Sequence, residues 1–170
     1  MWKFFQIIGI TGFFICLAIM YMTNLGVRGI RVYDPAFQSP DMKFHYSAGQ
    51  VTQAFEQIGN EGRTIYQKYL ILDSAFTLCF LISMVTITNL LFTGSLARNF
   101  LLAVCIFRAI FDILENSFLL IVLKSYPDIN KPMLIICSYF TTIKFVLLYI
   151  WILVIIIQLG LLGVQKLKTI

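Results

Sequence analysis

The stretch that most constrains the fold is the apolar run from residue 99 to 123, because charged side chains lie inside it. A helix of this length can cross a bilayer, which takes about 20 residues. Ionisable groups at the bilayer centre cost about 3 kcal/mol each, so this helix needs polar partners from the rest of the chain. At about 100° per residue its polar side chains fall on one face; they are Arg108, Asp112, Glu115 and Asn116.

The composition indicates an integral membrane protein with a single domain. Of the 170 residues, 59% are hydrophobic and only 12% are charged, whereas an ordinary soluble domain has about 25% charged residues. The net charge of +5 is spread along the chain without a Lys/Arg cluster, which argues against a nucleic-acid partner. The four cysteines lie in separate apolar runs and form no C-x-x-C motif, so we expect them to be core residues.

The hydrophobic pattern predicts an all-α membrane protein, a bundle of four transmembrane helices. The first run lacks a small-residue cleavage site, so we interpret it as a retained span rather than a signal peptide. Its Gly9 and Gly12 either form a notch for another helix or are simply tolerated there. Short links between the later runs favour antiparallel neighbours. The predicted spans cover residues 4–25, 70–92, 99–123 and 133–164.

The polar segment 26–69 predicts a loop that contains one short amphipathic helix over residues 47–59. Ser47 and Gln50 have the spacing of a capping box, and Gly59 is the predicted stop. We expect this helix to lie on the membrane surface or to cap the bundle, because it cannot bury its apolar face alone. A new helix is expected to begin at residues 61–63. The apolar face is formed by Val51, Phe55 and Ile58.

Four spans would place both termini on one side of the membrane and the long loop on the other. Measured from the loop side at about 1.5 Å per residue, Asp112 is about 17 Å deep and Lys144 about 18 Å deep. We therefore expect an ion pair between these two side chains. Arg108 can pair with Asp112 within its own helix. Glu115 has no base at its own depth, and Arg63 is the candidate to approach it.

These depths arrange the charges in a column that begins at the long-loop face. We predict a ligand pocket centred on Glu115 and Asn116 and open toward the long loop, because intramembrane ionisable residues are usually functional. The alternative is a set of ion pairs that only fixes helix register. The candidate ligand-binding residues are Arg63, Tyr66, Asp73, Arg108, Asp112, Glu115, Asn116 and Lys144.

No cofactor and no metal are predicted. The acidic side chains could offer oxygen ligands to a hard cation, but Arg108 and Lys144 at the same place oppose one. His45 lies in the loop without a nearby cysteine, so we expect an ordinary surface histidine rather than a zinc ligand. The sequence contains no nucleophile elbow, P-loop or dinucleotide fingerprint, and it leaves open whether the protein is an enzyme.

Two short segments resemble a loose group of small, uncharacterised four-span membrane proteins. They are E-G-R-T-I-Y-Q-K-Y-L-I-L-D before and into the second predicted span, and F-D-I-L-E-N in the third, followed by a lysine in the fourth. The resemblance spans residues 44–150 and implies no substrate. It implies a shared set of residues formed by Arg63, Tyr66, Asp73, Asp112, Glu115, Asn116 and Lys144.

Three functions are compatible with this pattern. The first is a small multi-pass membrane protein that binds, moves or modifies an anionic or zwitterionic lipid-like ligand in a charged pocket. The second is a non-enzymatic assembly subunit that docks a membrane protein partner or a second copy of itself. The third is a proton-coupled carrier in which Glu115 or Asp112 titrates.

The distribution of basic residues favours an orientation in the cell membrane. Of the 13 Lys and Arg residues, seven lie on the long-loop side, four on the side of the termini, and Arg108 and Lys144 within spans. The positive-inside rule then places the long loop in the cytoplasm.

Overall fold

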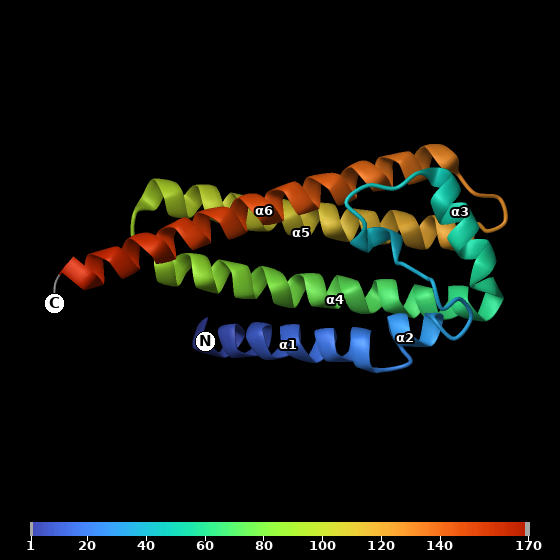
Figure 1. Ribbon diagram of the computed structural model, residues 1–170, viewed down its shortest axis with the longest axis horizontal. Helices are drawn as coiled ribbons and strands as arrows, with labels where there is room; N and C mark the ends of the chain where they lie inside the picture. Colours follow the sequence, from blue (N-terminus) through green and yellow to red (C-terminus); the bar gives the residue numbers. More distant parts are fainter. Residues whose placement is uncertain (1, 169–170) are drawn as a thin grey trace.

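Four long helices run side by side along the length of the molecule (Figure 1). The computed structural model describes residues 2–168, and every element within that range is a helix. Three stretches are long and apolar enough to cross a membrane, namely Trp2–Ile30, Gly59–Leu91 and Lys131–Lys166. The four long helices are α1 (Trp2–Met22), α4 (Gly59–Leu91), α5 (Ser95–Lys124) and α6 (Lys131–Lys168).

Helix α5 lies between α4 and α6, and α1 packs on the outer side of α4 (Figure 1). The close approach of α1 depends on its two glycines. A Cβ atom at Gly9 would lie 2.3 Å from Ile82 Cγ2, and one at Gly12 would lie 2.6 Å from Cys79 Sγ. The predicted small-residue notch is therefore confirmed as the contact between α1 and α4.

Two buried apolar clusters lie toward the two ends of the α4–α5–α6 group. The first is near the long loop and includes Phe55, Tyr69 and Leu119, and the second includes Met84 and Trp151. Charged and polar residues occupy the level between these clusters. This arrangement isolates the charges from both ends of the helices.

The segment between α1 and α4 folds into short helices that cover one end of the group. These are α2 (Val27–Ile30), the 3-10 helix η1 (Pro40–Met42) and α3 (Ala48–Gln57). The predicted capping box is confirmed, since the Ser47 hydroxyl accepts from the Gln50 backbone and the Gln50 side chain accepts from the Ser47 backbone. Gly59 takes a left-handed φ of +64° at the stop, a conformation that glycine adopts without strain.

Helix boundaries differ from the predicted ones by a few residues, as expected because helix ends are the least determined part of a pattern. The second predicted span is the inner part of α4, which begins at Gly59 and continues without a break to Leu91. Helices α2 and η1 were not predicted, because their Gly- and Pro-rich sequence has no helical periodicity. Helix α3 caps the group of helices, which is one of its two predicted positions (Figure 1).

Burial of the apolar face of α3 should hold the long loop in place. We expect Ile58→Ala to cost about 2–5 kcal/mol, because the side chain is 1% exposed and its removal leaves a cavity. Limited proteolysis of the loop should become faster in this variant. The matched control is Val32→Ala in the same loop, where the side chain is 73% exposed; equal proteolysis of the two variants would contradict the packing described here.

Candidate functional site

Lys144 lies at the centre of the buried charged cluster. Its Nζ is 2.7 Å from Asp112 Oδ1 and 2.7 Å from Glu115 Oε2. Asp112 is also paired with Arg108, one turn earlier on α5, at 2.7 Å, and accepts a hydrogen bond from Thr77 at 2.6 Å. The predicted ion pair between Asp112 and Lys144 is therefore confirmed.

The surroundings of Glu115 differ from the prediction, which gave it no base at its own depth. The two acids of α5 are three residues apart and share one face, so the long Lys144 side chain reaches both. Thr141 donates to Glu115 Oε1, and the Tyr46 hydroxyl donates to the same oxygen at 3.3 Å. Glu115 is fully buried behind this lysine.

Arg63 and Tyr66 lie nearer the loop end than predicted. Arg63 donates to the backbone carbonyl of Phe55 at 2.9 Å, and its guanidinium stacks over the ring of Tyr126 at 4.0 Å. The contact fastens α3 to the start of α4, so Arg63 is not the partner of Glu115. The Tyr66 hydroxyl donates to Asp41 at 3.1 Å.

Asp41 is a buried acid that sequence reasoning missed. Its Oδ1 accepts from the hydroxyls of Ser39 and Tyr66, and its Oδ2 accepts from Tyr69 at 3.1 Å. The residue is 1% exposed and no described base pairs with it. The only signal in the sequence is Pro40, which begins η1 and places Asp41 in its first turn.

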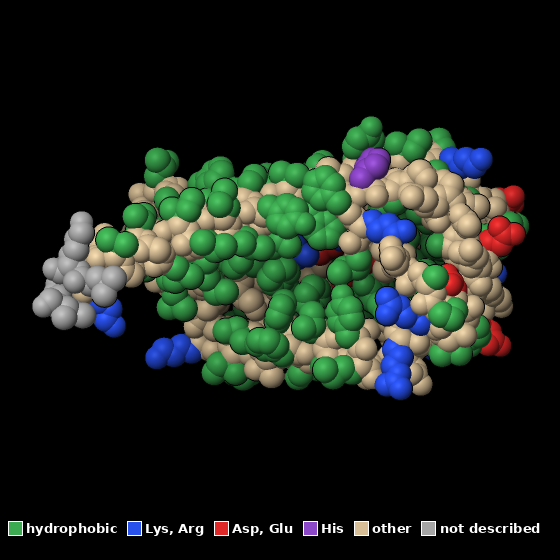
Figure 2. Space-filling view, in the orientation of Figure 1, with side chains coloured by type: hydrophobic (Ala, Val, Ile, Leu, Met, Phe, Trp, Pro, Cys, Tyr) green, Lys and Arg blue, Asp and Glu red, His purple; other side chains and the backbone are tan. Residues whose placement is uncertain are grey.

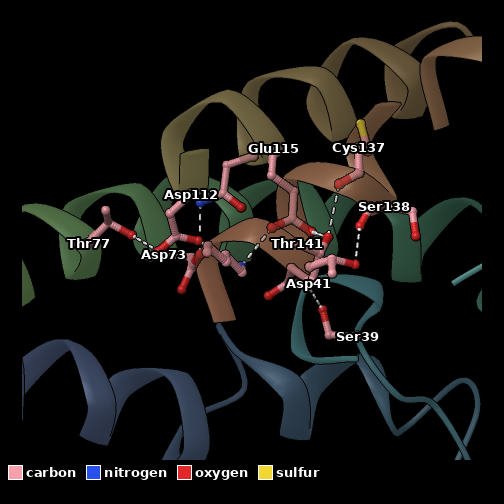
Figure 3. Close-up of polar contacts among 12 residues, drawn as sticks. Ser39, Asp41, Asp73, Thr77, Asp112, Glu115, Cys137, Ser138 and Thr141 are labelled. Atoms are coloured by element: carbon pink, nitrogen blue, oxygen red, sulfur yellow. Dashed lines mark hydrogen bonds and ion pairs between the residues drawn. The ribbon is translucent and has the colours of Figure 1, made fainter. Parts of the chain in front are cut away.

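Asp73 faces the same region from α4. The Asn116 side-chain amide donates to Asp73 Oδ2 at 2.7 Å. Its other oxygen, Oδ1, receives no hydrogen bond from any described residue, although Asp73 is only 5% exposed. Figure 3 shows the acidic side chains gathered between the helices and η1; they are Asp41, Asp73, Asp112 and Glu115.

A cavity of about 170 Å³ opens beside this cluster. Figure 2, which views the helices from the side, shows a hollow at mid-length with basic and acidic atoms at its bottom and hydrophobic side chains around it. Charged side chains in the lining are Asp41, Asp73, Arg108, Asp112 and Lys144. The remaining walls are apolar and consist of Met42, Phe76, Phe80, Phe145 and Leu148.

The position of this cavity corrects the predicted pocket. Glu115 and Asn116 are fully buried and do not line it, whereas Asp41 and Met42 from η1 do. The opening lies at the side of the helices (Figure 2), and η1 of the long loop forms part of its border. Asp112 and Lys144 lie at one level, as predicted from their depths. Depth along the helices does not predict that η1 borders the cavity at the loop end.

Arg108 offers donors that no described residue accepts. Its Nε and Nη1 are buried and unpartnered, while Nη2 pairs with Asp112. The guanidinium lies 4.6 Å from the centre of the Phe80 ring, a cation–π contact. Arg108 and Phe80 both belong to the cavity lining.

The loop next to η1 is fastened to α6. Thr142 donates to the Phe44 carbonyl at 2.9 Å, and the backbone N–H of Tyr46 donates to Ser138 at 2.9 Å. Burial raises the pKa of the Tyr46 phenol well above its ordinary value, so it remains a hydroxyl donor at neutral pH. His45 is exposed, and its Nδ1 is hydrogen-bonded to Ser138.

No group of three or more His, Cys, Asp or Glu residues in the described part of the chain is placed to hold a metal ion. Two of the carboxyl groups are already paired with Lys144 or Arg108. The charged groups that line the cavity can form ion pairs and hydrogen bonds with a polar group bound there.

Because Lys144 bridges two acids, a second substitution at Glu115 and one at Asp112 should restore different amounts of stability to a Lys144 variant. We expect Lys144→Met to cost about 3–5 kcal/mol, because it leaves Glu115 charged and without a base. Adding Glu115→Gln should restore more stability than adding Asp112→Asn, since the second change leaves Arg108 unpaired. Thermal unfolding in detergent measures this difference, with the exposed Lys68→Met as control; additive losses in both double variants would contradict the network.

Comparison of the chain with protein-family models, curated proteins and solved structures gave no match. The resemblance to the group of small four-span proteins is untested by these comparisons and stays a prediction.

Proposed function

We propose that the chain is a multi-pass protein of the cell membrane in which α1, α4, α5 and α6 all cross the bilayer. Three of these helices are apolar enough to do so by composition. Helix α5 has a similar length and turns its charged face toward α4 and α6, while Phe100, Phe107 and Ile110 remain exposed. The two ends of the described chain lie at the same end of the molecule (Figure 1), which supports placing both on one side of the membrane.

Within that membrane, we propose that the protein binds an amphiphile through the lateral cavity. The observation that carries this proposal is the combination of a charged floor and apolar walls in one cavity at mid-length of the helices. In a bilayer the side of the helices faces acyl chains, so a ligand that enters there needs a polar end and an apolar remainder.

The size of the cavity limits which part of an amphiphile it can hold. Its volume of about 170 Å³ is smaller than the roughly 300–1,000 Å³ of pockets that enclose a whole small molecule. It suits a headgroup and the first methylene groups, and the remaining chain would extend along Phe76 and Leu148 into lipid.

A second candidate function is that of an assembly subunit whose charge network only orders the helices. The observation that favours it is the position of Lys144, which satisfies Asp112 and Glu115 without any ligand. Such networks can specify the register of helices. The assembly function predicts that a substitution that fills the cavity leaves the crosslinking of lipid unchanged.

Filling the cavity should abolish amphiphile capture. Leu148→Trp adds volume to the wall, and we expect crosslinking of a photoreactive phospholipid analogue in vesicles to fall about tenfold, equivalent to about 1.4 kcal/mol. Mass spectrometry of the crosslinked peptides measures this loss. Leu153→Trp, on the same helix at a position 59% exposed, is the matched control. Equal crosslinking of both variants would favour the assembly function.

Orientation is tested by labelling single cysteines in a chain whose four native cysteines are replaced by alanine. We expect Gln57→Cys to resist a membrane-impermeant maleimide in intact cells, because the basic loop side should be cytoplasmic. Thr93→Cys, in the link at the opposite end, should react. The reverse pattern would place the loop outside, and labelling of both positions from one side would contradict four spans.

A further inference from the structure

The charges around the cavity do not balance. Four buried carboxyl groups share two basic side chains, Arg108 and Lys144. Both bases contact Asp112, and Lys144 also contacts Glu115. Two acids in the cavity lining, Asp41 and Asp73, are therefore without a cationic partner among the described residues.

These two acids differ in how many of their carboxyl oxygens accept a hydrogen bond. Asp41 accepts three hydroxyl hydrogen bonds that occupy both of its oxygens, and the two from Tyr66 and Tyr69 hold η1 against α4. Asp73 accepts from Asn116 through Oδ2 alone, and Oδ1 has no described partner. Asp73 is 5% exposed and lines the cavity, and its Oδ1 is not among the fully buried atoms, so this oxygen is open to the cavity. Its free oxygen is the acceptor that the cavity leaves for a ligand.

The walls beside Asp73 favour a positive charge as well. Phe76 and Phe80 come from the same helix as Asp73, and Phe145 comes from α6. Aromatic ring faces attract cations by about 0.5–2 kcal/mol. Arg108 already lies over Phe80, and Lys144 Nζ lies 5.6 Å from the centre of the Phe145 ring, so Phe76 is the ring of these three with no described cation over it. A carboxylate among phenyl rings in a small cavity is a suitable site for an ammonium group.

An anionic headgroup, one of the two kinds of ligand expected from the sequence, meets a less suitable surface. It would have to lie beside Asp41 and Asp73, neither of which is neutralised by a base. The two unpartnered donors of Arg108 are fully buried, and its guanidinium lies over the Phe80 ring. The basic side chains thus serve the acids of α5 rather than an incoming anion.

We propose that the amphiphile carries a protonated amine, and that this ammonium group donates a charge-assisted hydrogen bond to Asp73 Oδ1 in the lateral cavity. This inference rests on the proposed function, because it names the class of ligand for the same cavity. The apolar chain of the ligand extends along Phe76 and Leu148 into lipid, as proposed above. A lipid with an aminoalkyl headgroup and a free long-chain amine share this chemistry.

The first test compares probes that differ only in the polar end. The full-length protein in phosphatidylcholine nanodiscs is given a single-chain alkylamine, or the alcohol or carboxylic acid of the same chain length, as competitor of the photoreactive phospholipid analogue. We expect the amine to compete about 10-fold to 100-fold more strongly than the alcohol, as for a hydrogen bond to a charged group. Equal competition by amine, alcohol and acid would overturn the inference.

The second test removes the charge of Asp73. Asp73→Asn keeps the size of the side chain and a hydrogen-bond partner for Asn116, and we expect it to abolish the preference for the amine over the alcohol. Asp128→Asn, an exposed acid in the link before α6, should keep that preference. A preference that survives in Asp73→Asn would overturn the inference. The comparison of probes on the unmodified protein keeps the inference testable if Asp73→Asn fails to fold.

The two proposals fail in different ways. If the alcohol or the acid competes as well as the amine, and Leu148→Trp abolishes this competition, the cavity binds amphiphiles and the amine assignment is wrong. If no probe competes, both proposals are wrong. Nanodiscs that contain phosphatidylethanolamine identify the source: competition by this lipid assigns an aminoalkyl headgroup, and competition by the free amine alone assigns a long-chain amine.

Discussion

The ion pairs that Lys144 makes with two acids of α5 hold the middle of this protein together. Charged groups removed from water are stable only with partners that replace their hydration. One ammonium group lies 2.7 Å from both Asp112 and Glu115, and this fixes the register of α6 against α5. The apolar clusters on either side can then close over the charges, since each contains residues from α4, α5 and α6.

The position of Lys144 also explains on which side of α5 the cavity lies. Lys144 fills the space in front of Glu115, so the free volume that remains is on the α4 side of the lysine, next to Asp73. Asn116 reaches across from α5 to hold one oxygen of Asp73. Among the polar residues of α5, Glu115 pairs with α6, Asn116 contacts α4, and Asp112 contacts both.

Much of this arrangement could be predicted from the sequence, because it follows from periodicity and depth. The charges of α5 share a face, Asp112 and Lys144 meet at one level, and the capping box at Ser47 forms. The partner of Glu115 could not be predicted, because the reach of a lysine side chain depends on the rotation of α6. The burial of Asp41 was not predicted, because it depends on hydrogen bonds from Tyr66 and Tyr69. Asp41 lies in an irregular loop that is distant from these tyrosines in the sequence.

Helix η1 has a consequence for how a ligand would arrive. Asp41 is fixed by tyrosine hydroxyls of α4, and Met42 forms part of the cavity wall, so η1 covers the cavity on its loop side. On the proposed topology, the opening at the side of the helices faces lipid, so we expect the ligand to arrive through the bilayer. Occupancy would then follow the mole fraction of the ligand in the membrane rather than its concentration in water. A sparingly soluble amphiphile could therefore fill the cavity while its free aqueous concentration stays negligible.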